Sequence, residues 1–121
     1  MPVKKTLVLG ASENPQRYSY LAIQKLQLHH HPVIAIGKKA GNVHGIEISS
    51  NTEPQTDIDT VTLYLNPDNQ KKYIDYIISL NPKRIIFNPG TENEELADLA
   101  KKKGIKTIEA CTLVMLSTGQ Y

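Results

Sequence analysis

The chain alternates short apolar runs with longer stretches in which apolar residues recur every three or four positions. The short runs are typical of buried strands, and the longer stretches are typical of amphipathic helices. Five strands are predicted, at residues 6–9, 33–36, 60–65, 84–87 and 106–108, with a further short extended segment at 45–48. Helices are predicted from residue 15 or 19 to residue 30, from residue 67 to Asn81-Pro82 and from residue 91 to Gly104, with a short helix or turn at 112–116.

Capping residues support the helix boundaries. Asn66 is a suitable N-cap because Pro67 follows it at the first helical position. The run Thr91-Glu92-Asn93-Glu94 has the capping-box pattern, and Gly104 suits the end of the same helix. The first helix is expected to bury Tyr18, Leu21, Ala22 and Leu26.

Apolar strands that alternate with helices imply a parallel sheet covered on both faces. With right-handed crossovers, the sequence predicts an α/β fold of Rossmann-like, three-layer α/β/α type. Its five-stranded, mainly parallel sheet is expected in the order 3-2-1-4-5, and the flavodoxin-like order 2-1-3-4-5 is the alternative. In the first order, ligands bind between strands one and four, at their carboxyl ends. A length of 121 residues fits a single domain.

Residues 7–19 read LVLGASENPQRYS and join the first strand to the first helix. Gly10 permits a sharp turn and a close approach of a ligand to the backbone. Ala11 and Ser12 are small, and the following helix offers free N–H groups and the positive end of its dipole. Arg17 adds a cation with bidentate geometry for phosphate. The loop predicts a phosphate site, although a single glycine also fits an ordinary tight turn.

The second strand is followed by Gly37-Lys38-Lys39. NAD-binding Rossmann domains usually carry an acidic residue here, which binds the ribose hydroxyls. The two ammonium groups therefore disfavour NAD and favour a nucleotide with an additional ribose phosphate, such as NADP or coenzyme A. The alternative interpretation is a solvated lysine pair.

The fourth strand is followed by a loop that reads Asn88-Pro89-Gly90-Thr91. Three glutamates, at positions 92, 94 and 95, crowd the start of the next helix and would repel an anion there. We therefore expect Asn88, Gly90 and Thr91 to contact an uncharged part of a ligand.

Residues 8–19, VLGASENPQRYS, resemble the phosphate loop of small CoA-binding Rossmann-fold proteins. The segments PVIAIGKK, HGIEI, NPGTENEE and GIKTIEAC match this family in place, so that the resemblance runs from Lys5 to Leu116. These proteins are in turn similar to the CoA-binding domain of succinyl-CoA synthetase α subunits. The chain departs from the family pattern at His31-Pro32, at Gly37-Lys38-Lys39 and at Asn88-Pro89.

The resemblance implies that the chain binds coenzyme A or an acyl-CoA. It implies that the loop after the first strand faces the CoA phosphates and that Lys38 lies near the adenosine 3′-phosphate or the adenine. It also implies that residues after the third and fourth strands flank the pantetheine. The candidate cofactor-binding residues are Gly10, Ala11, Ser12, Asn14, Arg17, Tyr18, Ser19, Gly37, Lys38, Leu65, Asn66, Asn88 and Gly90.

The sequence presents no convincing catalytic set and no expected metal site. His29-His30-His31 falls at the predicted end of a helix, where histidines interact favourably with the helix dipole. Cys111 is interpreted as a structural cysteine, and the sharper hypothesis is a mixed disulfide with the CoA thiol. We therefore expect a cofactor-binding protein without catalysis of its own. The alternatives are an NADP-dependent or ligase-associated enzyme component and a nucleotide-sensing regulatory module.

The expected partner is the small-molecule nucleotide cofactor that the loop after the first strand and the family resemblance imply. A formal net charge of +2 and few aromatic residues argue against nucleic acid as a partner. No apolar run approaches the roughly 20 residues that span a bilayer, and the amino-terminal segment lacks the pattern of a signal peptide. With a single cysteine, these features lead us to expect a cytoplasmic protein. A protein partner or a homo-oligomer is left open.

Overall fold

The computed structural model describes residues 3–121, and Met1 and Pro2, which begin the segment examined for a signal peptide, lie outside this range. A seven-stranded sheet has the order β3-β4-β2-β1-β5-β6-β7. Neighbouring strands are parallel except for the antiparallel β3–β4 hairpin. The strands are β1 (Thr6–Ala11), β2 (Val33–Gly37), β3 (Gly41–Val43), β4 (Ile46–Ser49), β5 (Thr60–Leu63), β6 (Arg84–Phe87) and β7 (Lys106–Glu109).

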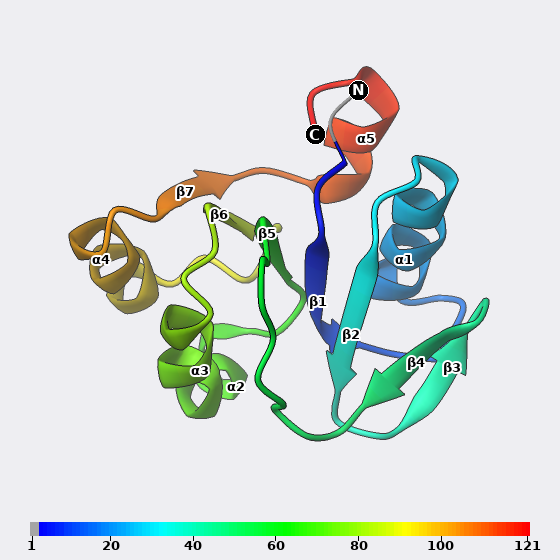
Figure 1. Cartoon of the computed structure of the whole chain (residues 1–121), viewed down its shortest axis with the longest axis horizontal. Coiled ribbons are helices and arrows are strands. Elements are labelled where there is room, and N and C mark those ends of the chain that lie inside the picture. The colour runs from blue at the N-terminus through cyan, green and yellow to red at the C-terminus, as the bar shows by residue number, and fades with distance from the viewer. Residues whose placement is uncertain (1–2) are drawn as a thin grey trace.

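Helices cover both faces of the sheet, as Figure 1 shows. On one face lie α1 (Tyr18–Leu28) and α5 (Thr112–Thr118). On the other face lie α2 (Pro67–Gln70), the 3₁₀ turn η1 (Lys71–Tyr73), α3 (Ile74–Ser79) and α4 (Glu94–Lys102). Between residues 3 and 121, no helix combines the length and the apolar character needed to cross a bilayer. The predicted α/β class and the mainly parallel sheet are confirmed.

The central strand shows why the strands read as unbroken apolar runs. Leu7 and Leu9 pack toward η1, α3 and α4, whereas Val8 and Ala11 pack toward α1 and α5. Leu7, Val8 and Leu9 are fully buried. A strand covered on both faces has no solvent-facing positions, so it shows no polar alternation.

The predicted strand order is wrong. The segment treated as a short extended piece forms β4, which pairs in parallel with β2 through Ala35↔Ile48 and Ile36↔Ser49. This pairing occupies the place beside β2 that the prediction had given to residues 60–65. Those residues contribute β5, which pairs with the other side of β1. The five predicted strands therefore have the alternative order 2-1-3-4-5, extended by the β3–β4 hairpin, and the crossover point lies between β1 and β5.

The first helix is rotated relative to the prediction. It buries Ser19, Ala22, Ile23 and Leu26 against the sheet. Tyr18 is 70% exposed and Leu21 is 37% exposed, so their expected burial is wrong. The helical period is correct, but the buried stripe is displaced to Ser19 and Ile23.

The other helix starts agree only in part with the predicted caps. The Asn66 side chain accepts a hydrogen bond from the Asn69 amide, with Pro67 in the first turn, so this predicted cap is confirmed. The cap of α4 is Asn93 rather than Thr91. Thr91 is buried, and its hydroxyl donates to the Asn88 carbonyl instead.

Candidate functional site

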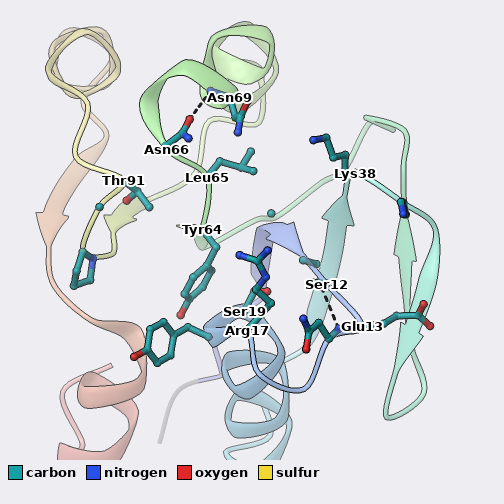
Figure 2. Close-up of a pocket in the computed structure, with 17 residues that line it drawn as sticks. Ser12, Glu13, Arg17, Ser19, Lys38, Tyr64, Leu65, Asn66, Asn69 and Thr91 are labelled. Carbon is teal, nitrogen blue, oxygen red and sulfur yellow. Dashed lines mark hydrogen bonds between the residues drawn. The ribbon is translucent and has the colours of Figure 1, made fainter.

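A cavity of about 640 Å³ opens where β1, β2, β5 and β6 end (Figure 2). This volume lies within the range of small-molecule sites, and the carboxyl edge near a crossover point is the usual ligand position in such sheets. All candidate residues except Gly37 and Asn88 line the cavity. The remaining lining residues are Glu13, Lys39, Tyr64, Asn69, Pro89 and Thr91.

Gly10 lies where the backbones of β1 and β5 come together. Its φ is +94°, a conformation that side chains disfavour. A Cβ at this position would lie 2.9 Å from the Tyr64 carbonyl carbon and 3.1 Å from the Leu65 side chain. The β1–β2 register shifts between Leu9 and Ala11, so the strand is irregular around Gly10. Glycine is therefore required here by the protein backbone itself.

Two candidate residues lie behind the cavity wall. Gly37 is buried, and a Cβ on it would lie 2.2 Å from the Ala11 carbonyl oxygen. Asn88 is 2% exposed, and its Nδ2 donates to the Thr62 hydroxyl (2.7 Å) and to the Leu63 carbonyl (2.9 Å). Its Oδ1 accepts from the Thr112 amide at 2.8 Å. The Asn88 side chain thus joins β5, β6 and the start of α5.

The loop after β1 is ordered by its own hydrogen bonds. The Asn14 amide donates to the Ser12 hydroxyl (3.1 Å), and the Asn14 carbonyl accepts from the Arg17 amide (3.0 Å). Within residues 3–121, the amides of Ser12, Tyr18 and Ser19 have no hydrogen-bond acceptor. The first turn of α1 also holds no acidic residue, and its N-cap makes no side-chain hydrogen bond. These N–H groups are therefore available to an anion at the positive end of the helix dipole.

Charged side chains of both signs surround this loop. Arg17 and Lys38 are exposed and approach the cavity from different elements (Figure 2). Lys39 also lines the cavity, beside Lys38. The sequence-based set lacked Glu13, whose Oε2 accepts a hydrogen bond from the Asn42 amide at 2.8 Å. No local pattern signals this residue, because its partner belongs to the β3–β4 hairpin.

Tyr64 forms part of the wall on the β5 side. Its hydroxyl is buried and has no hydrogen-bond partner among residues 3–121. Burial raises the pKa of Tyr64 well above its ordinary value. The phenol therefore stays protonated at neutral pH.

Gln70 braces the loops on the same side and is fully buried. Its Nε2 donates to the Leu65 carbonyl (2.7 Å) and to the Thr91 carbonyl (2.8 Å). Its Oε1 accepts from Asn93 Nδ2 at 2.9 Å. One side chain thus connects the segments that follow β5 and β6.

The sequence of residues 4–117 matches the model of the CoA binding domain family. The chain belongs to this family. The resemblance first noted in residues 8–19 is therefore confirmed. No curated protein matched the chain.

Several solved structures are similar to this CoA binding domain. A structure described as an uncharacterized protein is 50% identical, with a TM-score of 0.97 and full coverage of both chains. A hypothetical protein from Pyrococcus horikoshii OT3 is 24% identical, covers 96% of this chain and 83% of its own, and has a TM-score of 0.85. Acetyl-coenzyme A synthetase 1 from Ca. Korarchaeum cryptofilum, solved with phosphate and ADP, is 18% identical, with a TM-score of 0.70. It matches 89% of this chain but 26% of its own, and these two more distant likenesses concern the fold alone.

Cys111 and the histidines lie apart from the wall of this domain's cavity. Cys111 is half-buried immediately before α5 and does not line the cavity. Reaction with the CoA thiol stays a prediction. His31 accepts a hydrogen bond from the Lys4 amide at its Nδ1, at 3.0 Å. Within the described range, no three His, Cys, Asp or Glu residues are grouped to hold a metal ion.

Proposed function

We propose that the cavity binds coenzyme A or an acyl-CoA through the loop after β1, and that the chain does not catalyse a reaction by itself. One observation carries the proposal. Ser12, Tyr18 and Ser19, whose amides have no acceptor among residues 3–121, line the same cavity as Arg17 and Lys38. Membership of the CoA binding domain family supports the choice of cofactor.

In this proposal the pyrophosphate binds at the amides of Ser12, Tyr18 and Ser19. Arg17 neutralises part of its charge, because a guanidinium matches two phosphate oxygens at once. Lys38 and Lys39 take the adenosine 3′-phosphate. Gly10, Ala11 and Asn14 complete the loop around the diphosphate.

The pantetheine then follows the wall formed after β5 and β6. Tyr64, Leu65 and Pro89 give this wall an apolar character, whereas Asn66 and Gly90 offer hydrogen-bonding groups at its edge. An amide-containing, otherwise apolar arm suits such a mixed surface. Asn88, which lies behind the wall, positions Leu63 and Thr112 rather than the ligand.

The test is a calorimetric titration with CoA and with 3′-dephospho-CoA. We expect the native chain to bind dephospho-CoA about tenfold or more weakly, because an ionic contact is lost. Lys38→Ala should reduce the difference in affinity between CoA and dephospho-CoA. Arg17→Ala should lower the affinity for both ligands by the same factor. Lys102→Ala, which removes an exposed lysine from α4, is the matched control and changes neither affinity. Absence of binding by both ligands would refute the proposal.

The absence of catalysis is tested separately. The charged side chains at the cavity are Glu13, Arg17, Lys38 and Lys39. Glu13 directs its Oε2 to the Asn42 amide, and the three cations suit the binding of an anion. We expect acetyl-CoA to remain intact, by chromatography, after hours with the chain. Hydrolysis that depends on Ser12 or Glu13 would contradict this part of the proposal.

A further inference from the structure

Glu13 is an acid in a cavity otherwise supplied with cations and free amides. Its Oε2 accepts from the Asn42 amide at 2.8 Å, whereas its Oε1 has no hydrogen-bond partner among residues 3–121. Both Glu13 and the cations Lys38 and Lys39 line the cavity. A carboxylate in this place weakens anion binding unless it makes a favourable contact with the ligand.

The backbone of the β3–β4 hairpin holds this carboxylate in place. A Cβ on Gly41 would lie 2.3 Å from Glu13 Cδ and 2.7 Å from its Oε1. The glycine therefore leaves the space that the carboxylate occupies, and the next amide, that of Asn42, fixes its orientation. Figure 2 shows Glu13 extending from the loop toward the hairpin, on the Lys38 side of the cavity.

The position of Glu13 along the ligand follows from its neighbours. Glu13 directly follows Ser12, where the pyrophosphate is proposed to bind, and shares the cavity with Lys38, where the 3′-phosphate is proposed to bind. The group that links these phosphates in CoA is the ribose. Since its 3′-oxygen is phosphorylated and its 5′-oxygen is esterified, the 2′-hydroxyl is the one donor left on that ring.

We infer that Glu13 accepts a hydrogen bond from the ribose 2′-hydroxyl and excludes nucleotides that carry a 2′-phosphate. The inference rests on the proposed function and specifies which nucleotides the cavity selects. An ionised carboxylate is an acceptor only, so it pairs with a hydroxyl and repels a phosphate. Rossmann domains that bind NAD place such an acid at the end of the second strand. Here Gly37-Lys38-Lys39 occupies that place, and the acid comes from the loop after β1.

Three nucleotides are used to test the contact with the 2′-hydroxyl and the exclusion of a 2′-phosphate separately. They are adenosine 3′,5′-bisphosphate, its 2′-deoxy form and adenosine 2′,5′-bisphosphate. We expect the native chain to bind the 3′,5′-bisphosphate about tenfold more tightly than the 2′-deoxy form, and more tightly than the 2′,5′-bisphosphate. In Glu13→Ala the ribo and deoxy forms bind equally. In Glu13→Gln, whose amide oxygen can still accept from the Asn42 amide, the 2′,5′-bisphosphate gains affinity relative to the 3′,5′ isomer.

Glu47→Gln is the matched control, because it removes an exposed carboxylate from the same hairpin outside the cavity. It leaves both preferences unchanged, the one for the ribo over the 2′-deoxy form and the one for the 3′,5′ over the 2′,5′ isomer. If Glu13→Ala fails to fold, the isomer preference of Glu13→Gln decides. If CoA binds but the native chain treats the ribo and deoxy forms alike, or Glu13→Gln keeps the native isomer preference, the inference is overturned and the proposed function stands. If neither CoA nor any bisphosphate binds, both are overturned.

Discussion

Among single residues, Gly10 combines a positive φ with a close approach of two backbone segments. Ala at this position must adopt a positive φ and approach the Tyr64 carbonyl group to about 2.9 Å. We expect Gly10→Ala to lower the free energy of unfolding by roughly 2 to 4 kcal/mol, measured by urea denaturation. Gly45→Ala is the matched control. Its φ is +87° with nothing within 4 Å, so it loses only about 1 kcal/mol. Equal losses would show that the close approach to Tyr64 is unimportant.

His31 gives the fold a pH dependence. Burial, and then the charges of His29, Lys4 and Arg84, lower the pKa of His31, whose Nδ1 accepts from the Lys4 amide. The unfolded chain then binds a proton at a higher pH than the folded chain does. This contribution to stability is complete above the unfolded value of 6.5 and is lost as the pH falls through it, down to the lowered folded pKa.

The measurement is the melting temperature at pH 7.5 and at pH 5.0. His31→Asn should show a smaller drop between the two than the native chain. His29→Gln, which alters an exposed neighbour, is the control and should keep most of the native drop. A drop of native size in His31→Asn would assign the acid sensitivity to other groups.

At the level of single residues, the candidate site could be predicted only in part. Gly10, Ser12 and Arg17 line the cavity, and the sequence could single them out because they share one contiguous motif. Glu13 belongs to that motif too, but its role depends on the Asn42 amide, 29 positions away along the chain. Asn88 follows the fourth predicted strand, where a ligand contact was expected. Its side-chain amide instead forms hydrogen bonds with Thr62, Leu63 and Thr112, which come together only in the folded chain.

At the scale of elements, Gln70 links the segments after β5 and β6. Gln70→Met fills similar space but leaves the carbonyls of Leu65 and Thr91 and the Asn93 amide without this partner. We expect a loss of about 2 to 4 kcal/mol in the free energy of unfolding, because buried polar groups become unpaired. Calorimetry should also show weaker CoA binding, since Leu65 and Thr91 line the cavity. Gln16→Met, at an exposed position, is the control, and an equal loss there would contradict the bracing role.

The elements themselves were largely predictable, but their order was not. Buried strands can be recognised from their apolar runs. Asn66-Pro67 marks the start of a helix, because Asn suits the N-cap and Pro suits the first turn. Strand order depends on β4, whose buried Ile48 and half-buried Ile46 give too short a pattern to distinguish a strand from an extended loop. Thr91 and Asn93 both suit a helix cap. The choice between them was made by the hydrogen bond from Thr91 to Asn88, which the local sequence does not encode.

On the scale of the whole molecule, the predicted site lies at the carboxyl edge of the sheet despite the incorrect strand order. The loop after β1 borders the crossover point in both arrangements, so its role did not depend on which strand pairs with the far side of β1. The true neighbour is β5, which brings Tyr64, Leu65 and Asn66 directly against that loop.

Ligand binding at this junction should stabilise the molecule globally. At a CoA concentration a hundredfold above Kd, the free energy of unfolding should rise by about 2.7 kcal/mol. The check is a melting curve with and without CoA, together with hydrogen exchange of the segments 10–19 and 64–66. Both segments should gain protection, and Arg17→Ala should reduce the gain at equal ligand concentration. Protection confined to one segment would mean that the ligand does not bridge β1 and β5.

Because β1 lies at the centre of the sheet, the cavity is lined by two separate stretches of the polypeptide, residues 10–39 and residues 64–91. Every basic side chain that lines the cavity comes from residues 10–39, whereas Tyr64, Leu65 and Pro89, the wall proposed for the pantetheine, come from residues 64–91. If the cavity binds an acyl-CoA as proposed, substitutions in residues 64–91 would change the contacts to the pantetheine and its acyl group. The contacts to the phosphates, which come from residues 10–39, would be retained.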